Sequence, residues 1–121
     1  MRTEKYNPDE GGDDIKYAFE YNGLSAQLQE IDVIVAEVCG EHDGNDWHWI
    51  LQMKDGTFHY ASGGCDYTGW DCQSYASISE SVNTVQEALE FSPKEDSYHR
   101  GIKRVLTGQI EGTIPFAIYE V

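Results

Sequence analysis

The chain has 121 residues, of which 40% are hydrophobic and 12% aromatic, a composition sufficient for the core of one folded domain. Its 22 acidic residues outnumber the 8 basic ones and give a formal net charge of −14, which argues against direct binding to the polyanionic backbone of nucleic acids. The sequence shows neither a signal-peptide pattern nor an apolar run of about 18 residues that could span a membrane. We therefore expect a cytoplasmic protein without a membrane partner, in the host cytoplasm if a phage encodes it.

The negative charge is concentrated in the first three quarters of the chain. Residues 1–93 contain 18 acidic and 4 basic residues, a net charge of −14, whereas residues 94–121 contain 4 of each and are neutral. A strongly negative field steers a protein toward basic surfaces. The expected partner is therefore the basic surface of a nucleic-acid-handling protein.

The N-terminal part of the chain is predicted to contain an arm, a strand and a helix. Residues 1–14 are polar and include Pro8, so they are predicted to form a flexible arm that precedes a single domain at residues 15–121. The aromatic residues from Tyr17 to Tyr21 alternate as in a strand, and the apolar residues from Leu24 to Ile31 follow helical spacing. This pattern predicts a short strand followed by a helix.

The middle of the chain carries the strongest strand signals. Asp32–Cys39 is rich in β-branched residues and predicts a buried strand. Trp47–Lys54 and Thr57–Ser62 flank Asp55-Gly56, a dipeptide typical of tight hairpin turns. Because side chains alternate along a strand, the odd-numbered residues of the first hairpin strand should face one side and its even-numbered residues the other.

The C-terminal part of the chain is predicted to mix strands and helices. Gln73–Ser81 predicts a strand, and Asn83 is a candidate N-cap for a helix that follows. Ser92 begins a second helical pattern that ends at Gly108, and Thr113–Val121 predicts a closing strand at the sheet edge. The predicted fold is α+β, an antiparallel sheet of about four to five strands with two to three helices packed on one face.

The segment Gly63–Ser74, with the sequence GGCDYTGWDCQS, concentrates cysteines, carboxylates and aromatic rings. Its glycines predict a tight loop, in which the two aspartates would accept hydrogen bonds from backbone amides. The aromatic side chains of Tyr67 and Trp70 would then cover the core from the loop side. This architectural role requires no catalytic residue, metal ion or cofactor.

Two chemical alternatives for the same segment remain open. A metal site would use Cys65 and Cys72 with His59, although their spacing differs from that of common zinc motifs. A cysteine-dependent enzyme would pair either thiol with His48 or His59, although nearby carboxylates raise a thiol pKa and disfavour the reactive thiolate. A third alternative is a homo-oligomeric structural protein, for example a homodimer, that pairs through the predicted edge strand Thr113–Val121.

The stretch Gly64–Gln73, GCDYTGWDCQ, follows the aromatic hairpin and resembles a group of small uncharacterised phage and bacterial proteins. The resemblance covers roughly residues 43–91 and implies an origin in a mobile genetic element. By analogy with small acidic phage proteins, it suggests an anti-defence inhibitor, such as an anti-CRISPR or anti-restriction protein, or a nucleic-acid mimic.

The charge and the loop together predict a small acidic interaction protein without enzymatic activity. Its carboxylates would contact a basic partner, and aromatic side chains beside them would serve as anchors. The residues predicted to contact the partner are Asp43, Asp46, Asp66, Tyr67, Trp70 and Asp71.

Overall fold

The computed structural model describes most of the chain up to the third helix. The described residues are 4–7, 14–41, 45–66, 69–70, 73–92, 102 and 113–114. The strands are β1 (Glu4–Lys5), β2 (Ile31–Glu41), β3 (Asn45–Met53), β4 (Phe58–Cys65), β5 (Ser74–Ile78) and β6 (Thr113–Ile114). The helices are α1 (Asp14–Tyr21), α2 (Ser25–Gln29) and α3 (Val85–Leu89).

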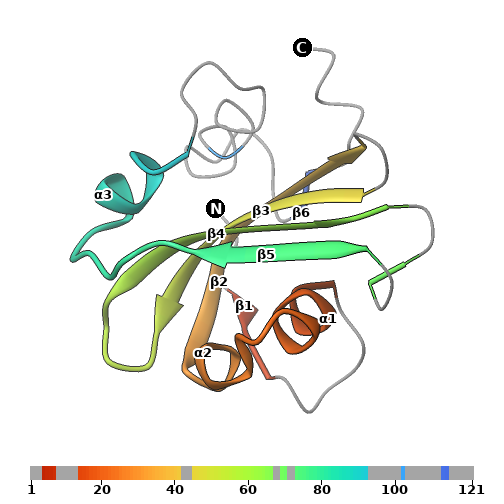
Figure 1. The fold of residues 1–121 in the computed structure, drawn as a ribbon. Coiled ribbons are helices and arrows are strands. Elements are labelled where there is room, and N and C mark those ends of the chain that lie inside the picture. The colour runs from red at the N-terminus through yellow and green to blue at the C-terminus, as the bar shows by residue number, and fades with distance from the viewer. Residues whose placement is uncertain are drawn as a thin grey trace.

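The strands form one sheet in the order β1-β2-β3-β4-β5, and all neighbours in this order are antiparallel (Figure 1). β6 pairs in parallel with β2. The predicted strands at Asp32–Cys39 and Gln73–Ser81 are confirmed as β2 and β5. The predicted hairpin is confirmed as β3 and β4, and Gly56 adopts the positive φ of 87° that its tight turn requires.

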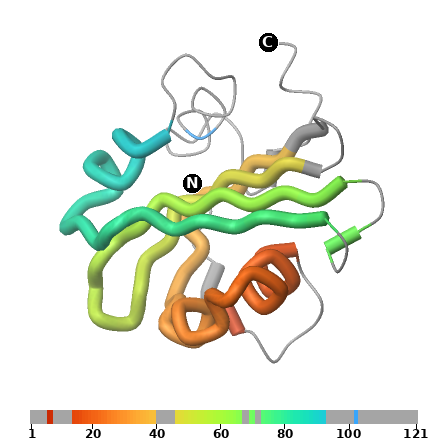
Figure 2. Tube along the Cα trace, in the orientation of Figure 1, coloured from red at the N-terminus to blue at the C-terminus, as the bar shows by residue number. Residues whose placement is uncertain are grey.

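The helices lie on opposite faces of the sheet (Figure 2). α1 and α2 pack with Ile34, Trp49 and Leu51 into one core cluster, on the face that carries the odd-numbered residues of β3. α3 packs with Ile50 and Tyr60 into a second cluster on the other face. The predicted α+β class and the pair of helices on one face are confirmed, and the third helix is located on the opposite face.

The predicted strand at Tyr17–Tyr21 is wrong, because these residues belong to α1. Ile15, Ala18 and Phe19 are fully buried, and their spacing of three and four residues is that of one helix face. Tyr17 and Tyr21, four residues apart, stack on an exposed side of the same helix with ring centroids 6.5 Å apart. The aromatic alternation therefore comes from two sides of a helix.

The predicted N-cap at Asn83 is off by one residue. The N-cap of α3 is Thr84, whose side-chain oxygen accepts a hydrogen bond from the backbone N–H of Glu87 at 3.1 Å. The Thr84 hydroxyl also donates to a carboxylate oxygen of Glu87 at 3.1 Å. The local sequence Thr-Val-Gln-Glu thus matches the capping box better than Asn-Thr-Val-Gln does.

Replacing Thr84 by alanine should lower the free energy of unfolding by about 1 kcal/mol, because a backbone donor of α3 loses its side-chain acceptor. Urea denaturation followed by circular dichroism measures this loss. Asn83→Ala is the matched control and should leave the stability within about 0.5 kcal/mol of the parent. An Asn83→Ala loss equal to or greater than that of Thr84→Ala would contradict the assignment.

Gly63 and Gly64 are part of β4, so the prediction that they form the tight loop is wrong. Both glycines make room for a neighbour. A Cβ atom on Gly63 would lie 3.1 Å from the Cβ atom of Ala18 on α1, so the absence of a side chain lets α1 approach the sheet. Gly64 lies between Asp46 of β3 and Tyr75 of β5 in the strand register, on the opposite face.

Several predicted elements lie partly or wholly outside the described residues. They include most of the second helix predicted from Ser92 to Gly108, of which Ile102 is described and buried, and all but the first two residues of the predicted strand Thr113–Val121. Within the predicted N-terminal arm, Glu4–Lys5 pair with β2 as β1. The flexibility of the arm remains a prediction.

Candidate functional site

The β2–β3 and β4–β5 connections, which carry most of the predicted partner-binding residues, meet at one end of the sheet. Asn45 at the start of β3 pairs with Cys65 at the end of β4, and Cys65 pairs with Ser74 at the start of β5. The register therefore brings Asp46 and Asp66 to the same end. Of the other predicted contact residues, Asp43, Tyr67 and Asp71 lie outside the described part of the chain, as does Cys72 of the predicted metal site.

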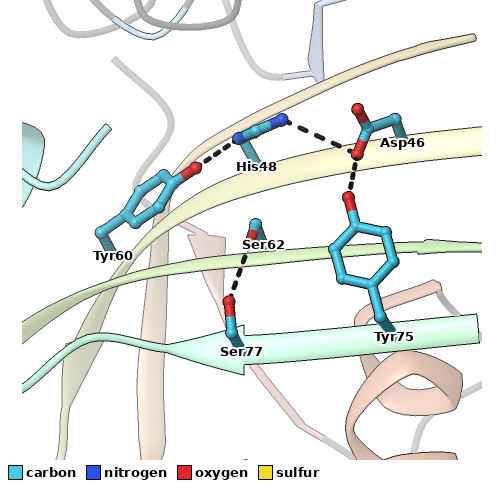
Figure 3. A network of polar contacts seen from close by, with 6 residues as sticks. All are labelled: Asp46, His48, Tyr60, Ser62, Tyr75 and Ser77. Carbon is cyan, nitrogen blue, oxygen red and sulfur yellow. Dashed lines mark hydrogen bonds and ion pairs between the residues drawn. The ribbon is translucent and has the colours of Figure 1, made fainter. Parts of the chain in front are cut away.

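A chain of polar contacts runs across the sheet beside this end, on the face that also carries α3 (Figure 3). The Tyr75 hydroxyl donates a hydrogen bond to Asp46 Oδ1 at 2.6 Å, and the same oxygen lies 3.8 Å from His48 Nε2. His48 Nδ1 and the Tyr60 hydroxyl share a hydrogen bond of 2.5 Å. This polar network, formed by Asp46, His48, Tyr60 and Tyr75, joins β3 to β5 through the Asp46 carboxylate and β3 to β4 through the His48–Tyr60 hydrogen bond.

The glycine in β4 explains how the polar network forms. Tyr75 on β5 and Asp46 on β3 are both register partners of Gly64, which lies between them. Because Gly64 has no side chain, the aromatic ring of Tyr75 can extend across β4 to the carboxylate. The tyrosine is 50% exposed, so it presents a ring and a bound carboxylate to solvent.

The cysteine segment is anchored to the core through Trp70. The Trp70 indole N–H donates to Asp14 Oδ1 at 2.9 Å, and its backbone oxygen accepts a hydrogen bond from the Ser74 hydroxyl at 2.8 Å. The ring is half-buried against the α1 side of the core, which confirms the predicted covering role of Trp70. The Asp66 backbone N–H donates to the Gln73 oxygen at 3.0 Å, so Asp66 continues the pairing of β4 with β5 by one residue.

The structure separates Cys65 from the two histidines of the metal and enzyme alternatives, while Cys72 lies outside the described residues. His59 and Cys65 are six residues apart on β4, a distance of about 20 Å along a strand. His48 is closer to Cys65, but its side chain lies on the opposite face of the sheet, because the two residues differ in strand parity through the register of β3 and β4. No group of three or more His, Cys, Asp or Glu side chains in the described residues is placed to hold a metal ion.

His59 borders a shallow hollow at the other end of the sheet that the sequence did not indicate. The hollow has a volume of about 320 Å³ and lies between α2 and the β3–β4 turn. His59 Nδ1 is 2.8 Å from the Ser79 backbone oxygen. Asp55, also on the rim, has a pKa lowered by hydrogen bonds from the Thr57 side chain and backbone, so its carboxylate stays ionised to a lower pH than an ordinary aspartate.

Cys39 is the one cysteine outside the segment Gly63–Ser74. It lies on β2 and is partly buried, and burial, together with the nearby carboxylates of Glu37 and Asp14, raises the pKa of its thiol to about 11. Cys39 and Cys65 are both thiols in the structure. A thiol with this pKa is protonated at neutral pH and is therefore a poor nucleophile.

Alkylation by iodoacetamide should be about ten-fold or more slower at Cys39 in the native protein than in the urea-unfolded chain at pH 8. The higher pKa lowers the thiolate fraction more than it raises the nucleophilicity of each thiolate, and burial adds to the effect. The rate is measured by mass spectrometry in a Cys65→Ser/Cys72→Ser background. Equal alkylation rates in the native protein and the unfolded chain would show that the fold neither shields the Cys39 thiol nor raises its pKa.

Carboxylates outnumber cationic groups on the exposed surface of the described residues. Lys16 and Lys54 are the only cationic residues among those whose side chains are described, and Lys16 is half-buried. The exposed acidic side chains in this set are Glu20, Glu30, Asp55, Glu80, Glu87 and Glu90. Among the described residues, six exposed acidic side chains thus compare with one exposed cationic side chain, that of Lys54.

The fold and the polar network define a small acidic α+β protein. None of the family models, curated proteins or solved structures compared with this chain matches it. In the described part of the chain, no helix is long and apolar enough to cross a membrane.

Proposed function

We propose that this chain is an acidic interaction protein that binds the basic surface of another protein, with its centre at the end of the sheet that carries Asp46 and Asp66. The proposal rests chiefly on one observation: the strand register places Asp46 and Asp66 at the same end of the sheet, on a described surface where exposed carboxylates outnumber exposed cationic groups. A field of this sign accelerates association with a cationic partner and disfavours anionic ones.

The polar network supports a binding role for this end. A partly exposed carboxylate that is already oriented by the Tyr75 hydroxyl loses little side-chain entropy when an arginine or lysine binds to it. The tyrosine ring beside it offers a surface for the apolar part of the same cation. These groups supply an acceptor and an aromatic face at one place.

The binding test uses the purified chain as bait in a lysate of its source organism and then measures the affinity for each captured partner in purified form. Affinity should fall steeply between about 50 and 300 mM salt, because the attraction is between exposed charges. Capture of no basic protein, or an affinity that ignores salt, would overturn the proposal.

Two matched double variants locate the contact. Asp46→Asn/Asp66→Asn and Glu87→Gln/Glu90→Gln each remove two negative charges, the first pair at the proposed site and the second on α3. The first pair should weaken binding about ten-fold, as for the loss of two charge-assisted contacts, and the second by much less. Equal effects would show that net charge alone attracts the partner.

Within this class, we propose a phage-type anti-defence inhibitor that mimics nucleic acid. The sequence resemblance and the charge support this finer assignment. A mimic occupies the channel of its target, so DNA should compete with the chain for the captured partner in a fluorescence-polarisation assay. Simultaneous binding of DNA and the chain would exclude mimicry and leave the acidic interaction function in place.

A further inference from the structure

The outer edge of β5 is the second feature of the described surface that is suited to binding. β5 is the last strand in the sheet order, and Figure 1 shows it at the front of the sheet with α1 beneath it. β2, at the opposite side, is paired with β1 and β6 in the described residues. Both sides of β2 are therefore paired with other strands, whereas the outer side of β5 has no neighbouring strand within the described residues.

Two hydrogen bonds at the ends of the β4–β5 ladder show which backbone groups of β5 point outward. The Ser79 N–H donates to the Tyr60 oxygen at 2.8 Å, and the Asp66 N–H donates to the Gln73 oxygen at 3.0 Å. Bonded pairs alternate along an antiparallel ladder. Tyr75 and Ser77 therefore bond to β4.

The remaining residues of β5, namely Ser74, Ala76 and Ile78, direct their N–H and C=O groups away from the sheet. Within the described residues, no hydrogen bond is recorded for these outward backbone groups. They form a row of donors and acceptors at the spacing of a further strand. Such an edge binds an extended peptide by strand addition.

Aromatic side chains lie on both sides of this edge. Phe19 of α1 points toward β3, where it meets Trp49 edge-on with centroids 6.3 Å apart. Tyr17 and Tyr21 lie on the exposed side of α1, the helix that contacts β5, and are 37% and 56% exposed. Tyr75 of β5 is exposed on the opposite face of the sheet, where its ring extends inward across β4 to Asp46.

We propose that the β5 edge binds an extended cationic segment of the partner protein as an added strand, an inference that rests on the proposed acidic binding function. Side chains alternate along the added strand, so its lysine or arginine side chains on one face would lie on the side of α1, which carries the Tyr17–Tyr21 pair. The exposed carboxylates nearest in the sequence are Glu20, on α1 between the two tyrosines, and Glu80, two residues after the end of β5. A second copy of this chain is disfavoured as the occupant, because each copy carries a net charge of −14.

The test uses labelled peptides of about nine residues that alternate lysine with threonine, a length and pattern suited to one strand. Two isomers of this peptide carry N-methyl groups on alternate amides, one isomer on the odd-numbered residues and the other on the even-numbered ones. Successive N–H groups of a strand point to opposite edges, so each isomer has only one of its two hydrogen-bonding edges blocked. One isomer should lose affinity by about ten-fold or more, since it loses several backbone hydrogen bonds, and the other should bind like the parent peptide. Hydrogen exchange at the amides of Ser74, Ala76 and Ile78 should slow when the parent peptide binds.

Ala76→Pro tests the same edge from the protein side. Proline removes an N–H that points outward and is tolerated on an edge strand, so the fold should persist while peptide affinity falls about ten-fold. Ser77→Lys and Ser77→Glu form a second, matched pair, because both lose the contact with the Ser62 hydroxyl but differ in charge. The glutamate variant should bind the peptide more tightly than the lysine variant.

The outcomes separate this inference from the proposed function. Salt-dependent peptide binding that ignores both the N-methyl groups and Ala76→Pro would overturn strand addition and leave the acidic binding function intact. Absence of peptide binding, together with tight capture of a basic protein, would likewise overturn only the proposal of strand addition at the β5 edge. A dimer seen by light scattering that buries the β5 edge would replace the peptide by a second copy, and absence of any cationic partner would overturn both proposals.

Discussion

Replacing Trp49 by alanine is expected to destabilise the protein by about 4 kcal/mol or more, a large part of the 5–15 kcal/mol typical of a single domain. Trp49 is fully buried at the centre of β3. Its ring stacks on Trp47 with centroids 6.1 Å apart and meets Phe19 of α1 edge-on. The substitution therefore removes a large aromatic volume where helix and sheet meet.

Trp49→Ala also removes a hydrogen bond to a carboxylate beside the ring, and this loss lowers the stability further. The Trp49 indole N–H donates to Glu37 Oε2 at 2.8 Å, and Glu37 on β2 is itself buried. Without this donor a buried acceptor loses a charge-assisted hydrogen bond, at a cost of about 1–3 kcal/mol. Trp49→Phe preserves much of the apolar volume and removes only this donor, so it should lose less stability than Trp49→Ala.

Urea denaturation followed by circular dichroism measures both variants. Glu37→Gln completes a double-mutant cycle with Trp49→Phe, because glutamine keeps an acceptor but removes the charge. We expect the pair to be non-additive, with a coupling of about 1 kcal/mol. A Trp49→Ala loss below about 1 kcal/mol would contradict the placement of this side chain at the centre of the core.

The sequence predicted the hairpin and its faces because the signals there are local. The Asp-Gly turn sets the register of β3 and β4, and strand parity then places Trp49 and Leu51 on one face and Ile50 on the other. This alternation of side chains is the same whichever face of the sheet is buried. The pattern is therefore readable without knowledge of what covers each face.

The N-terminal helix was missed because its amphipathic pattern is interrupted by exposed aromatic rings. Tyr17 and Tyr21 add apolar character to the wrong side of α1, so alternation and helical spacing compete in the sequence. Only the contact of Ala18 with the Gly63 region of β4, 45 positions away in the chain, resolves the conflict. Such a contact depends on the tertiary fold, which a local pattern does not contain.

The polar network was beyond sequence reasoning for a similar reason. Asp46 was expected as a partner contact, but its neighbours His48, Tyr60 and Tyr75 come from three strands and meet only after the register is set. Gly64 was assigned to a loop, although its lack of a side chain is what allows Tyr75 to reach across the sheet. Gly63 thus makes room for α1 on one face of the sheet, and Gly64 makes room for the Tyr75 ring on the other.

Larger side chains at Gly63 should therefore destabilise the protein, although glycine is normally a poor strand residue. A Cβ atom there would lie 3.1 Å from Ala18 Cβ, 3.2 Å from the Tyr75 backbone oxygen and 3.3 Å from Trp49 Cζ3. One of these neighbours is backbone and another is a fully buried ring, so neither yields easily. We expect Gly63→Ala to cost about 2 kcal/mol and Gly63→Val more than about 3 kcal/mol of unfolding free energy.

Ala18→Gly provides the internal control, since it removes the nearest of the three contacts. Alone it should cost about 1 kcal/mol through helix propensity. Combined with Gly63→Ala it should recover part of the loss, so that the double variant is more stable than the sum of the single effects by about 0.5 kcal/mol or more. Strict additivity in urea denaturation, or a stabilising Gly63→Ala, would mean that α1 does not lie against β4 as closely as the structure places it. Since Tyr17 and Tyr21 are carried by the same helix, that result would also remove the aromatic side of the proposed β5 binding edge.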